Sequence, residues 1–318
     1  MISFVTTFKP FKGHFRIIQL NALRSWLKFC EGCEVIVVGQ EEGVEEVAAK
    51  HDLKLIREVR RSTSGAPLLN DLLRKAESEA AYDYICLING DIILLNDFAD
   101  AFLSVRRRFK DFLMTARRVD VQVESLIDFT TEAVMDCLRS EVRASYASGK
   151  LGGADLFVFR KGLFDDVPPF VMGRFIWSRW LIFKALTSGV PAIDATPVMV
   201  AIHQTHDYSH IRDEEVKLAM RGMAGYVAVV KGSREYKWNL RLGGLAAYFS
   251  EEDCNYVLLP DGIYRRKDVR YLARYLIKLP ILNKHIHPFA LPLYKTVFPS
   301  RLVRTIVKRE LFKNKLLY

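Results

Sequence analysis

Residues 84–94 read YICLINGDIIL and form the most core-like run of the chain. Seven of these eleven residues are Ile, Leu or Cys, which is the composition of a buried strand, yet Asn89, Gly90 and Asp91 interrupt them. Ligands of open α/β sheets bind at the carboxyl ends of the strands. The triplet is therefore either a plain strand-to-loop turn, for which all three residue types are common, or part of a binding site.

Short apolar runs and helical patterns alternate on both sides of this stretch. Half of the 318 residues are hydrophobic, which suffices for one large domain, or for one domain with an appendage. The alternation predicts βαβ units, and thus an α/β fold with a mostly parallel central sheet covered by helices on both faces. The expected strands are 2–6, 34–39, 53–56, 84–88, 112–118, 152–160 and 190–196, and the expected helices are 17–27, 41–52, 66–80, 96–109 and 173–188, with a polar and mostly helical stretch over 120–150.

A histidine cluster, IHQTHDYSH, follows the last predicted strand. It holds His203, His206, Asp207 and His210, so three of the seven histidines of the chain lie within eight residues. Imidazoles near a carboxylate can hold a metal ion or act as acid and base, but the cluster is equally compatible with a polar loop that contains one packed histidine. One histidine joining Asp91 on a single metal ion is favoured over a three-histidine site, because no other zinc-like spacing is present.

Two further motifs precede this cluster. Gly152 and Gly153 come directly before a predicted strand that begins near Asp155, and paired glycines let a backbone lie close to a substrate or simply turn. Trp177 and Trp180 share one face of a predicted helix. Indole rings stack on sugars, although tryptophans at helical spacing more often pack in the core.

The order of these parts resembles the GT-A family of nucleotide-sugar glycosyltransferases. More narrowly, GGADLFVF, GRFIWSRWLIF, GVPAIDAT and IHQTHDYSH are similar to GGSDYFVF, GR-x-x-WDNW, IDAT and IHQNHDYSH of a bacterial and archaeal group. The resemblance covers residues 1 to about 245. It implies a transfer of sugar from a UDP-, GDP- or dTDP-linked donor to a glycan or lipid-linked acceptor, with Mn²⁺ or Mg²⁺ on the donor diphosphate.

The resemblance also implies roles for single residues. Asp91, with Asn89 in the D-x-D position, would bind the metal ion together with His203 or His206. The donor would contact Thr6, Thr7, Lys9, Gly65, Asn89, Asp91, Gly152 and Gly153, and the acceptor would contact Arg174, Trp177 and Trp180.

Two departures from the family pattern concern charge. Asn89 replaces the first carboxylate of D-x-D, and Ser178 and Arg179 stand where the acceptor helix usually bears an acidic residue. An inverting transfer needs a general base near the acceptor hydroxyl, and Asp155, followed by Asp207, is the best remaining candidate. A retaining transfer does not need this base in the same way, so the stereochemistry stays open.

The net charge of +10 is concentrated at the C-terminus. Residues 265–318 hold fourteen Lys or Arg and two acidic residues, a net +12, whereas residues 1–264 hold 33 basic and 35 acidic residues, a net −2. Arg270, Arg274 and Lys278 are spaced to form one stripe of an amphipathic helix. We expect a catalytic domain over 1–245 and a basic helical tail over 246–318 that attaches to anionic membrane, the alternative being helices that pack on the body or join subunits.

Nucleic acid is not an expected partner, because no known nucleic-acid module is present. Five scattered cysteines, the lack of a signal-peptide pattern and the lack of an 18-residue apolar run indicate a cytoplasmic protein, peripheral at the inner face of the cell membrane. The alternative to an enzyme is a non-catalytic scaffold that binds membranes or polyanions on a degenerate transferase fold.

Overall fold

The computed structural model describes residues 1–148, 151–174, 176–206 and 234–268, together with residues 271, 272, 274, 275 and 278. In chain order its elements are β1 (Ser3–Thr6), α1 (Gly13–Phe29), β2 (Glu34–Val38), α2 (Val44–Lys50), β3 (Lys54–Ile56), α3 (Leu69–Glu79), β4 (Tyr84–Ile88), β5 (Ile92–Ile93), α4 (Asn96–Arg108), β6 (Leu113–Val121), α5 (Glu132–Ala147), β7 (Ala154–Arg160), α6 (Trp177–Thr187), β8 (Ala192–Asp194), β9 (Ala201–Gln204), α9 (Arg234–Gly243), the 3₁₀ helices η1 (Gly244–Tyr248) and η2 (Glu251–Asp253), β10 (Tyr256–Leu259) and β11 (Gly262–Arg265).

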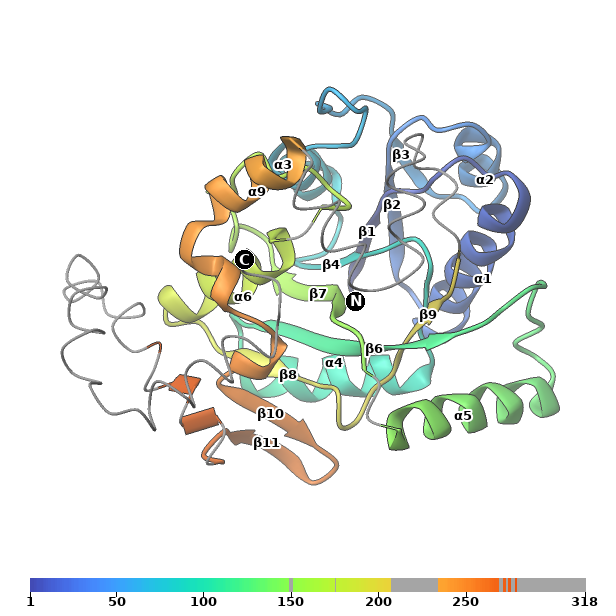
Figure 1. Ribbon diagram of the computed structural model, residues 1–318. Helices are drawn as coiled ribbons and strands as arrows, with labels where there is room; N and C mark the ends of the chain where they lie inside the picture. The colour runs from blue at the N-terminus through green and yellow to red at the C-terminus, as the bar shows by residue number, and fades with distance from the viewer. Residues whose placement is uncertain are drawn as a thin grey trace.

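One large sheet runs through the molecule (Figure 1). Its strand order is β11-β10-β8-β6-β7-β4-β1-β2-β3, with β5 and β9 paired beside this path. Along the path, only the pairs made by β7 and the β10–β11 pair are antiparallel. The predicted α/β class with a mostly parallel sheet is therefore confirmed.

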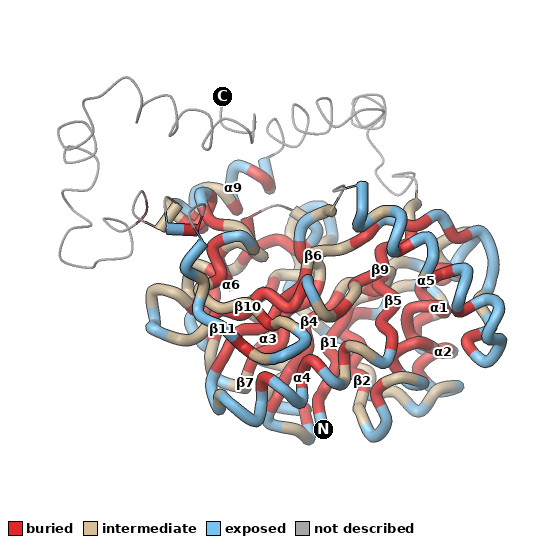
Figure 2. The backbone as a smooth tube through the Cα atoms, turned by 90° about the horizontal axis from the view of Figure 1, so that it is seen from below, coloured by how far each residue is buried: buried red, intermediate tan, exposed pale blue. Residues whose placement is uncertain are grey.

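The strands bury both of their faces, as a parallel sheet covered by helices requires. On one face, Phe4 of β1 stacks on Trp26 of α1 with ring centroids 5.6 Å apart, and both belong to a cluster that includes Phe98 of α4. On the other face, Val5 belongs to a cluster with Leu72 of α3 and other side chains of α3 and α6. Figure 2 shows the buried strands at the centre, with exposed segments around them.

Helix α5 covers a smaller part of the sheet. Its Met135, Leu138 and Val142 are buried in a third cluster, which contains Val119 of β6 and Ile202 of β9. Figure 1 shows α5 alongside the end of β6. Within the stretch of 120–150 predicted to be mostly helical, residues 132–147 form this helix, and it packs where β9 pairs with β6.

The body of the protein extends beyond the predicted boundary at residue 245. Strands β10 and β11 continue the same sheet, because β10 pairs in parallel with β8. Arg274 and Lys278, which we expected to face lipid, turn towards the body instead: Nη2 of Arg274 lies 3.0 Å and Nζ of Lys278 lies 2.5 Å from the carboxylate of Asp253. Among the described tail residues, Arg274 and Lys278 therefore contact the body through Asp253, which agrees with the alternative that the tail packs on the body.

No helix within the described ranges combines the length and the apolar character that crossing a bilayer requires. Residues 207–233 and 279–318 lie outside these ranges.

Candidate functional site

Asn89, Gly90 and Asp91 form the turn that connects β4 to β5. A Cβ atom added to Gly90 would lie only 2.6 Å from Cδ1 of Phe8 and 3.0 Å from the carbonyl oxygen of Thr7. Side chains do not tolerate such contacts, so glycine is needed because the chain after β1 passes close to the turn. This packing places Asp91 at the carboxyl ends of both β4 and β1.

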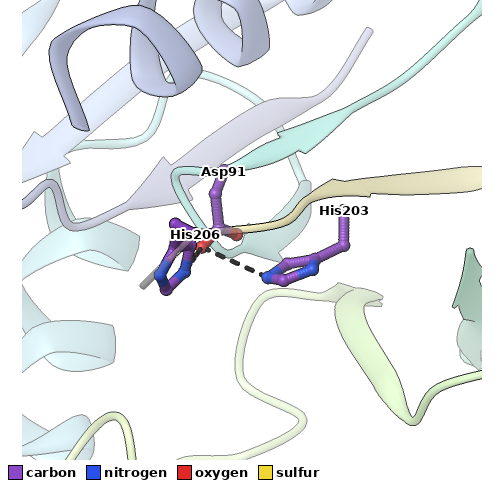
Figure 3. A group of neighbouring side chains, drawn as sticks. All are labelled: Asp91, His203 and His206. Carbon is purple, nitrogen blue, oxygen red and sulfur yellow. Dashed lines mark hydrogen bonds and ion pairs between the residues drawn. The ribbon is translucent and has the colours of Figure 1, made fainter. Parts of the chain in front are cut away.

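The pairing of β5 with β9 brings two histidines to Asp91. Ile92 lies opposite His203 in this antiparallel pair. Nε2 of His203 is 3.7 Å from Oδ2 of Asp91, and Nε2 of His206 is 3.2 Å from the same oxygen (Figure 3). One ligand atom from each of the three residues lies within 4.8 Å of the others. The structure thus gathers around Asp91 both histidines that the sequence proposed as alternatives.

The carboxyl group of Asp91 is suited to binding a cation, because it is ionised and one of its oxygens is unpaired within the described part of the chain. Its Oδ1 atom is buried and has no hydrogen-bond partner among the described residues. Burial acts to raise the pKa of this carboxyl, but the hydrogen bond with His206 and the charges of His203, His206 and Lys9 hold the pKa far below its usual range. An ionised carboxylate with a free oxygen beside two imidazoles is a donor set for a divalent transition metal such as Mn²⁺, whereas Mg²⁺ prefers oxygen ligands throughout.

The end of β1 borders this group. Thr6 is the last residue of β1, and Thr7 and Lys9 follow it. Nζ of Lys9 lies 4.3 Å from the ring centroid of Phe15, and that ring lies 5.2 Å from the ring of His206. Lys9 is thus a cation within electrostatic range of Asp91, where a phosphate group could meet it.

Three buried amide side chains hold the backbone around the site in place through hydrogen bonds. Gln204 donates to the carbonyl oxygen of Asp91 through its backbone N–H (3.2 Å) and through Nε2 (3.1 Å). Gln19 accepts from the N–H of Lys9 (2.6 Å) and donates to its carbonyl (3.0 Å), and Asn21 donates to Oε1 of Gln204 (3.0 Å). These residues were not predicted from the sequence, although amides within the apolar helix of residues 17–27 are a signal that could have pointed to Gln19 and Asn21.

Gly152, the first of the paired glycines, has a packing role. A Cβ atom on Gly152 would lie 2.8 Å from Cγ of Arg118, so glycine makes room for this arginine. Nη1 of Arg118 forms an ion pair with Oδ2 of Asp155, whose carboxylate is mostly buried. The N–H of Asn89 donates to the carbonyl of Asp155 (3.0 Å), which places Asp155 beside the turn that holds Asp91.

Gly65 and Arg174, predicted on the donor and acceptor sides respectively, are linked through helix α9. Gly65 has a positive φ of +86°, and its carbonyl accepts from Nη1 of Arg61 (2.8 Å). The neighbouring Ser64 donates its N–H to Oε1 of Glu235 (3.3 Å), while Nη2 of Arg174 lies 2.8 Å from Oε2 of the same glutamate. Glu235 therefore ties the loop after β3 to the chain before α6.

Both tryptophans of α6 lie in the core. Trp177 is 6% exposed and packs edge-on against Phe157, and Trp180 is 7% exposed. This placement favours their interpretation as core residues over sugar stacking. Arg179, at the position where the resembling family has an acidic residue, donates from Nη1 to the carbonyl of Ala247 (2.7 Å) and so holds η1 against α6.

Asp207, the second candidate base, and His210 lie outside the described residues.

No family model matches this chain. No curated protein matches it either.

Solved structures with a similar fold include the following three proteins. The mannosyltransferase PcManGT from Pyrobaculum calidifontis, solved with GDP-Man and Mn²⁺, is 13% identical, with 100% of this chain and 87% of that chain covered and a TM-score of 0.44. Residues 1–349 of TarS from S. aureus, with UDP-GlcNAc, are 9% identical, with 88% and 80% covered and a TM-score of 0.45. Glucosyl-3-phosphoglycerate synthase from Mycobacterium tuberculosis, with Mn²⁺, UDP and phosphoglyceric acid, is 13% identical, with 72% and 78% covered and a TM-score of 0.42.

Two of these proteins were solved with a nucleotide sugar and the third with UDP. Structural similarity at TM-scores below 0.5 does not establish a shared function, so the function is inferred from the site of this chain.

Proposed function

We propose that this protein is a metal-dependent glycosyltransferase that moves a sugar from a nucleotide-sugar donor to a hydroxyl group of a glycan or lipid-linked acceptor. The observation that carries the proposal is the group of Asp91, His203 and His206, with ligand atoms within 4.8 Å of one another. It lies at the carboxyl end of β4, where open α/β sheets bind their ligands.

Asp91, His203 and His206 would hold the metal ion. When bound, a divalent cation neutralises the negative charge that develops on a diphosphate leaving group. Lys9 supplies a further positive charge on the same side, since its cation already acts on Asp91. Thr6 and Thr7 border this space.

Three further positions complete the proposed donor site. The side-chain amide of Asn89 has no hydrogen-bond partner among the described residues, so it is free to bind a ribose or phosphate oxygen. Gly65 lies in the loop that follows β3, where such enzymes contact the ribose. Gly152 and Gly153 would border the donor sugar.

In the proposed transfer, the acceptor oxygen bonds to the anomeric carbon of the donor sugar while the bond from that carbon to the diphosphate oxygen breaks. The hydroxyl proton passes to a protein base or to the departing diphosphate. Asp155 is our candidate base within the described residues, because Arg118 pairs with its Oδ2 and no described residue hydrogen-bonds its Oδ1. Asp207 is the second candidate.

Membrane attachment is a separate part of the proposal and rests on composition. Arg274 and Lys278 are engaged by Asp253, so the anionic surface would be bound by the other basic residues of 265–318. Such a location at the inner face of the cell membrane would suit a lipid-linked acceptor.

The experiment that tests the enzyme proposal is calorimetric titration of UDP, GDP and dTDP into the full chain, with Mn²⁺ and with chelator. We expect one nucleotide to bind in the presence of Mn²⁺ only, and Asp91→Ala to abolish that binding. Asp136→Ala is the matched control, because Asp136 lies on the exposed side of α5. If no nucleoside diphosphate binds with Mn²⁺, the enzyme proposal is wrong and the scaffold alternative gains support.

A further inference from the structure

Strand β6 places a carboxylate next to His203, on the side of the imidazole ring opposite Asp91. β6 and β9 run in parallel, with Asp120 opposite His203 in the register. Partners on adjacent strands project from the same face of a sheet. Accordingly, Oδ1 of Asp120 lies 2.9 Å from Nδ1 of His203.

The two ring nitrogens of His203 therefore face different carboxylates. Nδ1 faces Asp120 at 2.9 Å, and Nε2 faces Asp91 at 3.7 Å. A neutral imidazole carries one proton, and a carboxylate can only accept a hydrogen bond. Nδ1 of His203 is not aligned for a hydrogen bond with Asp120, but in a neutral ring the nearer carboxylate favours a proton on Nδ1. The lone pair of Nε2 is then directed at the space shared with Asp91 and His206.

Asp120 is itself held in place. Nε of Arg118 lies 3.0 Å from Oδ1 of Asp120, the same oxygen that faces His203. Nη1 of the same guanidinium group forms the ion pair with Asp155, and the side chain of Arg118 occupies the room that Gly152 leaves. The ion pair with Arg118 thus keeps the half-exposed carboxylate of Asp120 next to the imidazole of His203.

We propose that Asp120 is a positioning residue, which fixes the tautomer and ring orientation of His203 so that Nε2 is presented to a divalent cation. The inference rests on the proposed metal site and deepens it. Partners of this kind typically change metal affinity by a factor of about 10 to 100 when removed. Nothing in the sequence singled out Asp120, which begins the predicted polar stretch of 120–150 but belongs to β6 in the structure.

The tautomer can be measured directly in metal-free protein. We suggest nitrogen-15 NMR of the histidine side chains of the full chain at alkaline pH, with His203→Gln used to assign the signal of His203. The wild type should show a protonated Nδ1 and an unprotonated Nε2. Asp120→Asn keeps the shape of the side chain but adds an N–H donor, so the tautomer should redistribute towards a protonated Nε2, and Asp120→Ala should leave a mixture.

The second measurement is Mn²⁺ affinity by calorimetry without nucleotide. We expect Asp120→Asn and Asp120→Ala to weaken binding at least tenfold, and Asp136→Asn, an exposed control on α5, to leave it unchanged. Circular dichroism checks that each variant is folded, and Asp120→Asn decides the question if the alanine variant does not fold.

The proposal is overturned if the tautomer of His203 in Asp120→Asn equals that of the wild type. It is equally overturned if Mn²⁺ affinity changes by less than twofold. Failure of the wild type to bind Mn²⁺ would instead remove the proposed function, while the tautomer would still report whether Asp120 orients His203.

Discussion

Nε2 of His206 lies 3.2 Å from Oδ2 of Asp91, although 115 positions separate the two residues in the chain. Two short strands make this contact possible, since β5 begins directly after Asp91 and β9 ends two residues before His206. The site therefore depends on the β5–β9 pair as much as on its own side chains.

The donor set predicts a preference among metal ions. Two imidazoles favour Mn²⁺ over Mg²⁺, because Mg²⁺ prefers oxygen ligands in octahedral geometry. After treatment with chelator, we expect Mn²⁺ to restore nucleotide binding at concentrations at least tenfold lower than Mg²⁺ does. Calorimetry with each ion in turn provides the measurement, and equal potency of the two ions would contradict the assigned ligands.

Asn89→Asp should reduce this preference. The change adds a carboxylate next to Asp91 and creates an oxygen ligand at the turn, so affinity for both ions should rise, by about tenfold or 1.4 kcal/mol for Mg²⁺. Asn89→Ala should weaken nucleotide binding only modestly, whereas Asp91→Ala should abolish it. An equal loss in both alanine variants would show that Asn89 is itself indispensable.

Gly90→Ala should destabilise the protein. The new methyl group would lie 2.6 Å from Phe8 and 3.0 Å from the carbonyl of Thr7, and such overpacking costs about 1–3 kcal/mol. Chemical denaturation measures the change in the free energy of unfolding. Gly153→Ala is the matched control, because its Cβ would meet only Glu251, at an ordinary 3.7 Å.

A second variant separates steric clash from other causes. Gly90→Ala should cost less stability in a Phe8→Ala background than in the wild type, because the ring atoms in conflict are gone. Strict additivity of the two changes would argue against the contact with Phe8.

Asp97 should make stability depend on pH. Burial raises the pKa of its carboxyl to about 6, although the N–H of Val200 donates to Oδ2 at 3.0 Å. The native state then keeps a proton that the unfolded chain loses near the ordinary aspartate pKa of 3.8. The resulting stabilisation is fully present below that pH and is lost as the pH rises through about 6, with a size on the order of 2–3 kcal/mol.

Asp97→Asn tests this dependence, because an amide does not titrate and can still accept the hydrogen bond from Val200. As the pH rises from 4 to 7, the free energy of unfolding of the wild type should therefore fall by about 2–3 kcal/mol relative to that of the variant. Urea denaturation across this range provides the measurement. A constant difference would mean that Asp97 has an ordinary pKa.

The basic tail should bind anionic vesicles through residues that Asp253 does not engage. Each basic residue near such a surface contributes about 1 kcal/mol, so replacing four of them by Glu in the full chain should reduce co-sedimentation with phosphatidylserine vesicles by more than tenfold. The residues to replace are Arg301, Arg304, Lys308 and Arg309. Equal replacements at exposed positions of the body should have little effect, for which the control set is Lys28, Lys50, Arg107 and Lys110.

If the tail variant and the control variant co-sediment with the vesicles to the same extent, the proposed membrane attachment is wrong. The same assay at high salt provides a check, because screening weakens surface electrostatics.

The fold class and the location of the candidate site could both be predicted from local sequence. Apolar runs such as 84–88 are dictated by burial, and a strand that buries both faces requires helices on either side, so the α/β pattern is visible locally. The break at Asn89, Gly90 and Asp91 was visible for the same reason, since polar residues at the end of such a run need a partner or a function.

Which side chains meet, by contrast, follows from the folded sheet. Asp120, Gln204 and Arg118 acquire their roles from strand order and register, which bring together residues far apart in the chain, and no local pattern encodes that register. The same reason explains Arg274 and Lys278: both contact the carboxylate of Asp253, which only the folded body brings to them.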